Sequence, residues 1–199
     1  MSRSESHHAQ RRGQGSATLR LFVALDLPDD AQRTVTDWQE LVFADLPDLR
    51  INRSLHLTLA FLGTTPASAV PELEAALAAQ PFALLPVAPG APLFLPERGR
   101  KRVVALPLVA APQAPAGLPA LLDLQARVSA ALADTGCYTP ERRPYLPHLT
   151  VARFRRPGQP FSLQNVNLPE LCLGRLVLYT SDLAKGGAVH TPLVTFLAR

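Results

Sequence analysis

The chain has little of what would place a protein in a membrane or an oxidising compartment. No apolar run approaches the roughly 20 residues that span a bilayer, although 47% of the residues are hydrophobic. The first 16 residues are polar and lack the apolar segment of a signal peptide. Only two cysteines are present, Cys137 and Cys172, which suits a reducing compartment. We expect a cytoplasmic protein that does not associate with membranes.

The chain also has no cysteines at metal-ligand spacing, and it has few lysines. Neither cysteine stands in the spacing of a metal site, so we expect no metal and no other cofactor. Of the 20 basic residues only two are lysines, Lys101 and Lys185, and the net charge is +4. Arginine forks suit phosphate, but a coding bias explains the same preference in a chain rich in Ala, Pro and Leu. Basic clusters at residues 98–102, 142–143 and 153–156 fit a nucleic-acid groove and equally fit solvated loops.

The chain has five histidines, and two of them stand in a repeated tetrapeptide. The copies are His56-Leu57-Thr58-Leu59 and His148-Leu149-Thr150-Val151, 92 residues apart by subtraction. Both lie in apolar runs that read as buried strands. Because residues two apart in a strand face the same way, each copy places an imidazole beside a hydroxyl. One copy alone would be weak evidence, since a lone strand histidine is usually structural; two matching copies are much stronger.

Together the two copies would supply what an in-line displacement at phosphorus needs without a metal. One imidazole can act as a base for the nucleophile and the other as an acid for the leaving group, since free imidazole titrates near pH 6.5. The hydroxyls can donate hydrogen bonds to the phosphoryl oxygens. From the residues alone, either histidine could take either role.

At these motifs the sequence resembles the 2H phosphoesterase superfamily. The wider pattern resembles its RNA 2′,3′-cyclic phosphodiesterase branch, whose members are also called 2′-5′ RNA ligases. The matching stretches are residues 20–28, 55–63 and 143–153, with a weaker match from Leu178 to Leu193. The resemblance covers about residues 19–199 in the family's order. It implies hydrolysis of an RNA 2′,3′-cyclic phosphate to a 2′-phosphate.

The resemblance also implies roles for individual residues. His56 would be the proton donor to the leaving oxygen, and His148 the proton acceptor that activates water. Thr58 and Thr150 would bind the non-bridging oxygens. Arg153 stands where family members carry an arginine, but strict alternation turns it away from His148 unless a bulge or the strand end intervenes.

The same alternation makes a prediction about Ala60. This residue should lie on the face of His56 and Thr58, at a place where the family often has a basic residue, so that one phosphate contact is missing. The family's aromatic residue ahead of the first motif is also absent from residues 49–52. Trp38 fits a helix core better than a base-stacking platform, and His190 fits a loop near the cleft better than a catalyst.

Periodicity and turn signals predict an α+β fold. We expect strands at residues 20–25, 55–62, 82–87, 92–95, 102–108, 173–180 and 189–197, besides the second motif strand. Helices are expected from Pro28, over 68–80 and over 119–135. One motif in each half suggests two pseudo-symmetric lobes, each an antiparallel sheet with helices on its outer face, facing across a central cleft. We expect a disordered polar tail at residues 1–18 and a single two-lobed domain at 19–199.

Several functions remain compatible with the motifs. The expected partners are RNA ends or small cyclic nucleotides, bound by a monomer. The reverse reaction, 2′-5′ RNA ligation, would use the same groups. A related enzyme could act on another cyclic nucleotide or on ADP-ribose cyclic phosphate, and a non-catalytic RNA-binding module would use the histidines only to contact phosphate.

Overall fold

The structure of the protein is a computed structural model that describes residues 17–163, 168–184 and 187–199. Most of the predicted polar tail, residues 1–16, lies outside the described residues. The end of that predicted tail is ordered: the first strand begins at Thr18, and the carbonyl of Ala17 accepts a hydrogen bond from the amide of Ala67 at 2.8 Å.

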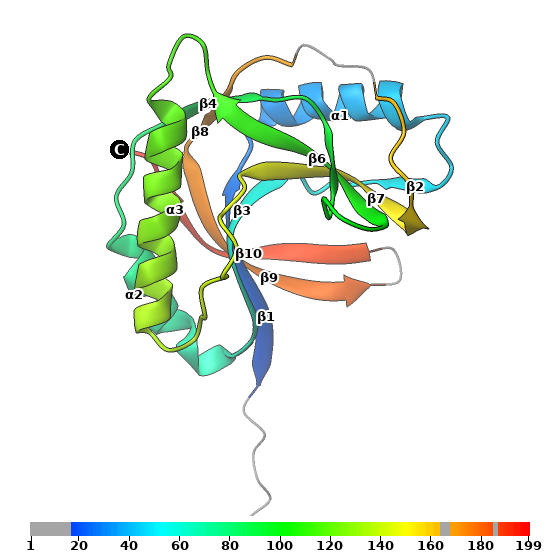
Figure 1. Ribbon diagram of the computed structural model, residues 1–199. Helices are drawn as coiled ribbons and strands as arrows, with labels where there is room; N and C mark the ends of the chain where they lie inside the picture. The colour runs from blue at the N-terminus through cyan, green and yellow to red at the C-terminus, as the bar shows by residue number, and fades with distance from the viewer. Residues whose placement is uncertain (1–16, 164–167, 185–186) are drawn as a thin grey trace, which may run out of the picture.

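The centre of the molecule is a curled antiparallel sheet of ten strands (Figure 1). Its main path runs in the order β10-β9-β1-β3-β7-β6-β4-β8, with β2 added on β7 and β5 on β6. The strands are β1 (Thr18–Asp26), β2 (Leu49–Ile51), β3 (His56–Pro66), β4 (Leu85–Pro89), β5 (Leu93–Leu95), β6 (Lys101–Ala110), β7 (His148–Gly158), β8 (Leu171–Leu173), β9 (Arg175–Ala184) and β10 (Gly187–Leu197).

The two motif strands, β3 and β7, meet in the middle of this path. They are joined through a single register pair, Leu57 with Leu149. On one side lie β1, β9 and β10, and on the other β6, β4 and β8. Each motif strand is therefore the innermost strand of its half of the sheet. Both motifs lie at the junction of the two halves. The motifs meet at this junction because the two central strands pair over a very short length.

Helices cover the sheet at two places. Helix α1 (Asp29–Phe43) runs beside β2, and helix α3 (Gly117–Asp134) packs on β3, β4 and β6. A 3-10 turn η1 (Ala67–Ala69) leads into α2 (Val70–Ala78), which packs on α3 (Figure 1). Trp38 is 4% exposed in the α1 core and packs edge-on against Phe43, which confirms its structural role. None of the described helices combines the length and apolar composition of a bilayer crossing.

The predicted α+β class is confirmed. All three predicted helices form, and the long strands are found within a few residues of their expected positions. The short strands β2 and β8 were not predicted, because three residues carry too little alternation to be recognised. The core is built from leucine and valine of both halves, including Leu25, Leu57, Leu149 and Val151.

Candidate active site

The β3–β7 register brings the two motifs together in a crossed arrangement. One residue to either side of the Leu57–Leu149 pair, His56 comes opposite Thr150, and Thr58 comes opposite His148. Both leucines are fully buried, so the flanking residues turn to the other face of the sheet. Neighbours opposite one another in an antiparallel pair have Cβ atoms roughly 5 Å apart. The two histidines therefore stand on a diagonal with a hydroxyl beside each.

Both motif strands carry a β-bulge at the same position after the motif threonine. In β3, Thr58 pairs with Ala24 and Ala60 with Val23, so Leu59 is the extra residue. In β7, Thr150 pairs with Ala105 and Ala152 with Val104, so Val151 is the extra residue. A bulge lets two consecutive side chains point to one face.

The bulge in β3 corrects the prediction for Ala60. This residue is 3% exposed and belongs to the hydrophobic core, not to the face of His56 and Thr58. The next residue, Phe61, returns to the motif face, where it is 46% exposed and lines the pocket. Strict alternation failed here because the extra residue reverses the sense of every side chain beyond it.

The bulge in β7 returns Arg153 to the motif face, where it lines the pocket with His148 and Thr150. Its register partner across β2 is Arg50, which lines the same pocket. Burial and the neighbouring Arg50 charge lower the pKa of the Arg153 guanidinium below its ordinary value. Two arginines placed opposite one another repel, and an anion between them would relieve that repulsion.

Both catalytic candidates use the same backbone contact to fix their rings. His148 Nδ1–H donates to the carbonyl of Leu146 at 2.8 Å, and His56 has a hydrogen bond to the carbonyl of Ser54. In each case the acceptor lies two residues earlier. Because a carbonyl can only accept, Nδ1 of His148 carries the proton, and its Nε2 is the nitrogen left for proton transfer.

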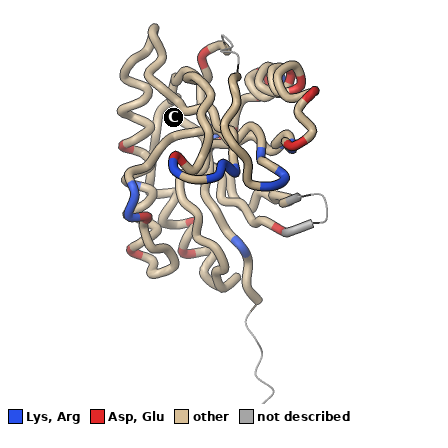
Figure 2. Tube along the Cα trace, turned by 45° about the vertical axis from the view of Figure 1, so that its right-hand side comes forward, with Lys and Arg blue, Asp and Glu red and all other residues tan. Residues whose placement is uncertain are grey.

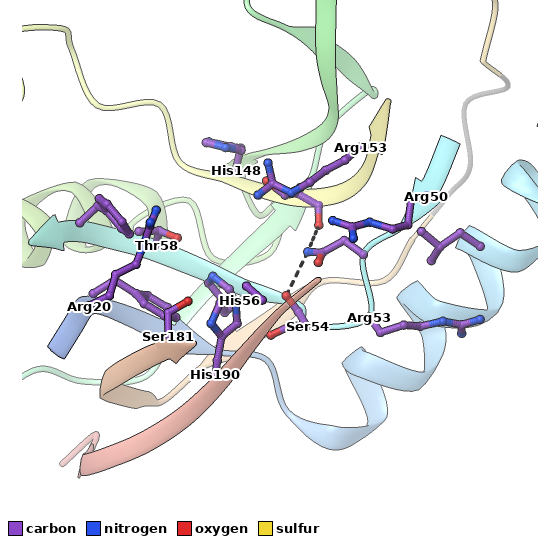
Figure 3. Close-up of a pocket in the computed structure, with 16 residues that line it drawn as sticks. Arg20, Arg50, Arg53, Ser54, His56, Thr58, His148, Arg153, Ser181 and His190 are labelled. Carbon is purple, nitrogen blue, oxygen red and sulfur yellow. Dashed lines mark hydrogen bonds between the residues drawn. The ribbon is translucent and has the colours of Figure 1, made fainter. Parts of the chain in front are cut away.

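Polar side chains beneath the site tie the two motif strands together. The Asn52 amide donates to the carbonyls of Ser54 at 3.0 Å and Thr150 at 2.7 Å (dashed in Figure 3). The buried Gln39 of α1 donates to the carbonyls of Asn52 and Val151 at 2.9 and 2.7 Å. The Tyr145 hydroxyl donates to the carbonyl of Thr58 at 2.8 Å. These bonds hold both bulged segments in place.

The motif face opens into a pocket of about 600 Å³ between the halves of the sheet. In Figure 3, His148, Arg153 and Arg50 lie along one side and His56, His190 and Ser181 along the other. The described residues that line it include four arginines and no Asp or Glu: Arg20, Phe22, Arg50, Ile51, Asn52, Arg53, Ser54, His56, Thr58, Phe61, His148, Thr150, Arg153, Ser181, Ala188 and His190. Basic segments also gather towards the middle of the face shown in Figure 2, with most acidic ones at its periphery. The pocket suits an anionic ligand of nucleotide size.

His56 is packed among aromatic rings on the β1 side of the pocket. Its ring centroid lies 5.0 Å from that of Phe22 and 5.4 Å from that of His190, which meets it edge-on at 87°. Burial is the largest cause that lowers the pKa of His56, to about 4, and nearby His190, Arg153 and His148 add to the effect. In the ligand-free pocket His56 is therefore neutral at pH 7.

The structure brings further residues to the pocket, and it corrects the predicted place of one of them. His190 lies in β10, not in a loop, and its register partner is Ser181. Arg20 lies in β1 with its guanidinium carbon 4.9 Å from the centre of the Phe61 ring. Arg50 was overlooked because β2 is short. Only the weak match around residues 178–193 could have drawn attention to the β9–β10 segment.

Among the described residues, no three His, Cys, Asp or Glu side chains gather in a way that could hold a metal ion. The groups that face the pocket are imidazoles, hydroxyls and guanidiniums. These are proton-transfer groups and anion ligands.

Comparison with known proteins identifies the family. The sequence profile of the 2′-5′ RNA ligase superfamily matches residues 27–172, which include both motifs. The chain belongs to the 2′-5′ RNA ligase superfamily. No protein among curated sequences matches it. Membership in this superfamily of phosphoesterases makes the protein an enzyme of phosphodiester cleavage or ligation.

Solved structures of other proteins share the superfamily fold. E. coli LigT in its apo form is 26% identical, with a TM-score of 0.71, and the match covers 92% of this chain and 99% of that one. E. coli LigT complexed with 3′-AMP is 25% identical, with a TM-score of 0.73 and the same coverage. TT0787 of Thermus thermophilus matches in fold, at 24% identity and a TM-score of 0.75, over 91% of this chain and 98% of that one.

Proposed function

We propose that the protein hydrolyses RNA 2′,3′-cyclic phosphate ends to 2′-phosphomonoesters without a metal ion. The observation that carries the proposal is the crossed pair of bulged His-x-Thr strands in an arginine-lined pocket. It supplies two ring-fixed imidazoles on opposite strands, with a hydroxyl beside each. An in-line displacement needs an acid and a base on opposite sides of phosphorus, together with donors to the oxygens between them.

In the proposed mechanism, His148 Nε2 takes a proton from the attacking water. The water oxygen bonds to phosphorus, and the bond from phosphorus to the 3′ oxygen breaks. His56 Nε2 gives its proton to that leaving oxygen. Thr58, Thr150 and Arg153 bind the non-bridging oxygens, whose negative charge increases in the transition state.

The lowered pKa of His56 couples its protonation to substrate binding. A donor must be protonated, yet burial and nearby positive charges keep His56 neutral in the ligand-free pocket. A bound phosphodiester brings a negative charge that offsets the positive charge of Arg153. The substrate would thus raise the pKa of the residue that donates to it. A strongly acidic imidazolium is also a strong donor to a poor leaving group.

The comparison proteins support a nucleotide substrate. E. coli LigT has been crystallised with 3′-AMP, which is the size of ligand that the pocket admits. The chemistry also permits 2′-5′ ligation, another cyclic nucleotide, or phosphate binding without turnover. The backbone hydrogen bonds that orient both imidazoles favour turnover, since a binding site for phosphate alone would not need two oriented proton carriers.

The test is incubation of the purified protein with 2′,3′-cyclic nucleotides and with a short RNA that ends in a cyclic phosphate. Each reaction is run with and without exhaustive EDTA treatment. We expect hydrolysis of the RNA at an unchanged rate in EDTA. Loss of activity in EDTA that a divalent ion restores would overturn the metal-free mechanism. Absence of turnover on every substrate, by protein that still binds the RNA, would favour the binding module.

A further inference from the structure

His190 is a pocket residue that packs on a catalytic candidate and that the mechanism above does not use. Its ring meets His56 edge-on at a centroid distance of 5.4 Å and Phe22 edge-on at 4.8 Å. The β9–β10 register places it opposite Ser181, a 6% exposed serine that also lines the pocket. A third imidazole thus lies beside the residue that would protonate the leaving oxygen.

The two nitrogens of His190 have different surroundings. Nδ1 is buried, and no described residue offers it a hydrogen-bond partner. An imidazolium has N–H groups at both positions, so charging this ring would bury an unsatisfied donor. The neutral form with the proton on Nε2 avoids that cost. Burial, followed by the charge of Arg153, lowers the pKa of His190 in the same direction.

With its proton on Nε2, neutral His190 is a hydrogen-bond donor among the residues that line the pocket beside His56. A donor of this kind stabilises an oxygen on which negative charge develops, as a neutral histidine can do for a carbonyl oxygen. We propose that His190 is a third catalytic residue, whose Nε2–H donates a hydrogen bond to the leaving 3′ oxygen while His56 transfers its proton to that oxygen. His190 keeps its own proton throughout, so the proton balance of the reaction is unchanged. The inference rests on the proposed function and on the donor role of His56.

The test compares two substitutions of His190 in the full chain, with cyclic-phosphate RNA as the substrate. His190→Phe keeps an aromatic ring against Phe22 and His56 but removes the donor. His190→Gln keeps an N–H at about the reach of Nε2. We expect His190→Phe to lower kcat roughly tenfold to hundredfold, below the ~10²–10³ of a fully enclosed donor, because His190 is half-exposed. His190→Gln should retain most of kcat.

The control is Val189→Ala, an exposed neighbour in β10 that does not line the pocket and should keep wild-type activity. Thermal unfolding checks that each variant is folded, and NMR titration follows His56 directly. Because neutral His190 carries no charge, its replacement by Phe should leave the pKa of His56 low, held there by burial and by the facing groups Arg153 and His148.

Unchanged kcat in folded His190→Phe would overturn the proposal, and so would an equal loss in both variants, which would indicate ring packing. A pKa of His56 that rises to the ordinary imidazole value in His190→Phe would also contradict it, because His190 would then act on His56 as a charge and not as a neutral donor. If wild-type protein has no activity on cyclic phosphates, it is the proposed function that fails, and the wild-type reaction shows this before any variant is made.

Discussion

His56 and His148 have matching backbone contacts but different surroundings. Each ring is held by the carbonyl two residues earlier, while His56 alone is packed among Phe22 and His190. The motif thus fixes the orientation of both rings, and the neighbouring strands distinguish their proton affinities. Identical tetrapeptide patterns can in this way supply two unequal partners in proton transfer.

The first prediction concerns removal of these imidazoles. His56→Ala and His148→Ala should each lower kcat by ~10²–10⁴, because each removes one general acid or base. Thr58→Ala and Thr150→Ala should lose less, since each removes one positioning hydrogen bond. Steady-state kinetics on cyclic-phosphate RNA, with circular dichroism as the check on folding, measures both. A folded histidine variant with near-wild-type turnover would refute paired-histidine catalysis.

The second prediction concerns pH. The active enzyme needs one protonated and one neutral imidazole, so the profile changes slope where His56 titrates. In kcat/KM, which reports the free enzyme, the limb due to His56 should lie near pH 4, since burial and positive neighbours lower the pKa of this proton donor. In kcat the limb should move to higher pH, because the bound phosphodiester raises the pKa of His56. These values belong to the pair of groups. A kcat/KM profile with no change of slope near pH 4 would show that burial does not lower the pKa of His56.

At the scale of the elements, the bulges decide which side chains reach the pocket. Gln39 is fully buried and donates to the carbonyl of Val151, the extra residue of the β7 bulge. The helix α1 therefore supports the backbone that turns Arg153 towards the pocket. A substitution of Gln39 can therefore weaken this support without changing the groups proposed for catalysis.

The third prediction follows from that contact. Gln39→Leu keeps the volume but leaves the carbonyls of Asn52 and Val151 without this donor, at a cost of about 1–3 kcal/mol. The free energy of unfolding, from denaturant titration, should fall by that amount, and KM should rise as the bulge relaxes. Gln32→Leu, at a half-exposed position of the same helix, is the control and should change neither. Equal effects of the two substitutions would show that the contact does not support the site.

The motif strands, three helices and four motif residues were predictable because they rest on local signals of period and spacing. The bulges were not, since an extra residue such as Val151 is fixed by its partner strand and leaves no mark in its own sequence. That is why alternation assigned Ala60 to the pocket and left Arg153 unresolved. His190, Arg20 and Arg50 lie outside the two motif strands. The register of β10, β1 and β2 brings them to the site.

At the scale of the whole molecule, the charge distribution bears on substrate length. The net charge is +4, and basic segments gather towards the middle of one face (Figure 2). The pocket of about 600 Å³ has the size of one nucleotide, so a preference for longer RNA would have to come from charges outside it.

The fourth prediction is therefore a difference in salt dependence. The kcat/KM for a cyclic-phosphate oligonucleotide should fall more steeply with salt than that for a cyclic mononucleotide, because more phosphates release counterions. Arg98→Gln together with Arg100→Gln, at exposed positions before β6, should reduce the oligonucleotide slope and spare the mononucleotide. An equal salt dependence of kcat/KM for both substrates would mean that these exposed arginines do not contact the RNA.

The central claim is that His56 protonates the 3′ oxygen while His148 activates water on the opposite side of phosphorus. It is tested most directly by the isomer of the product, determined by ³¹P NMR against authentic 2′- and 3′-phosphate standards after hydrolysis of a cyclic-phosphate RNA. The account predicts a 2′-phosphate, because the bond to the 3′ oxygen is the one that breaks. A 3′-phosphate would mean that the ribose binds in the opposite orientation, and it would contradict the assigned roles even if both histidines proved essential.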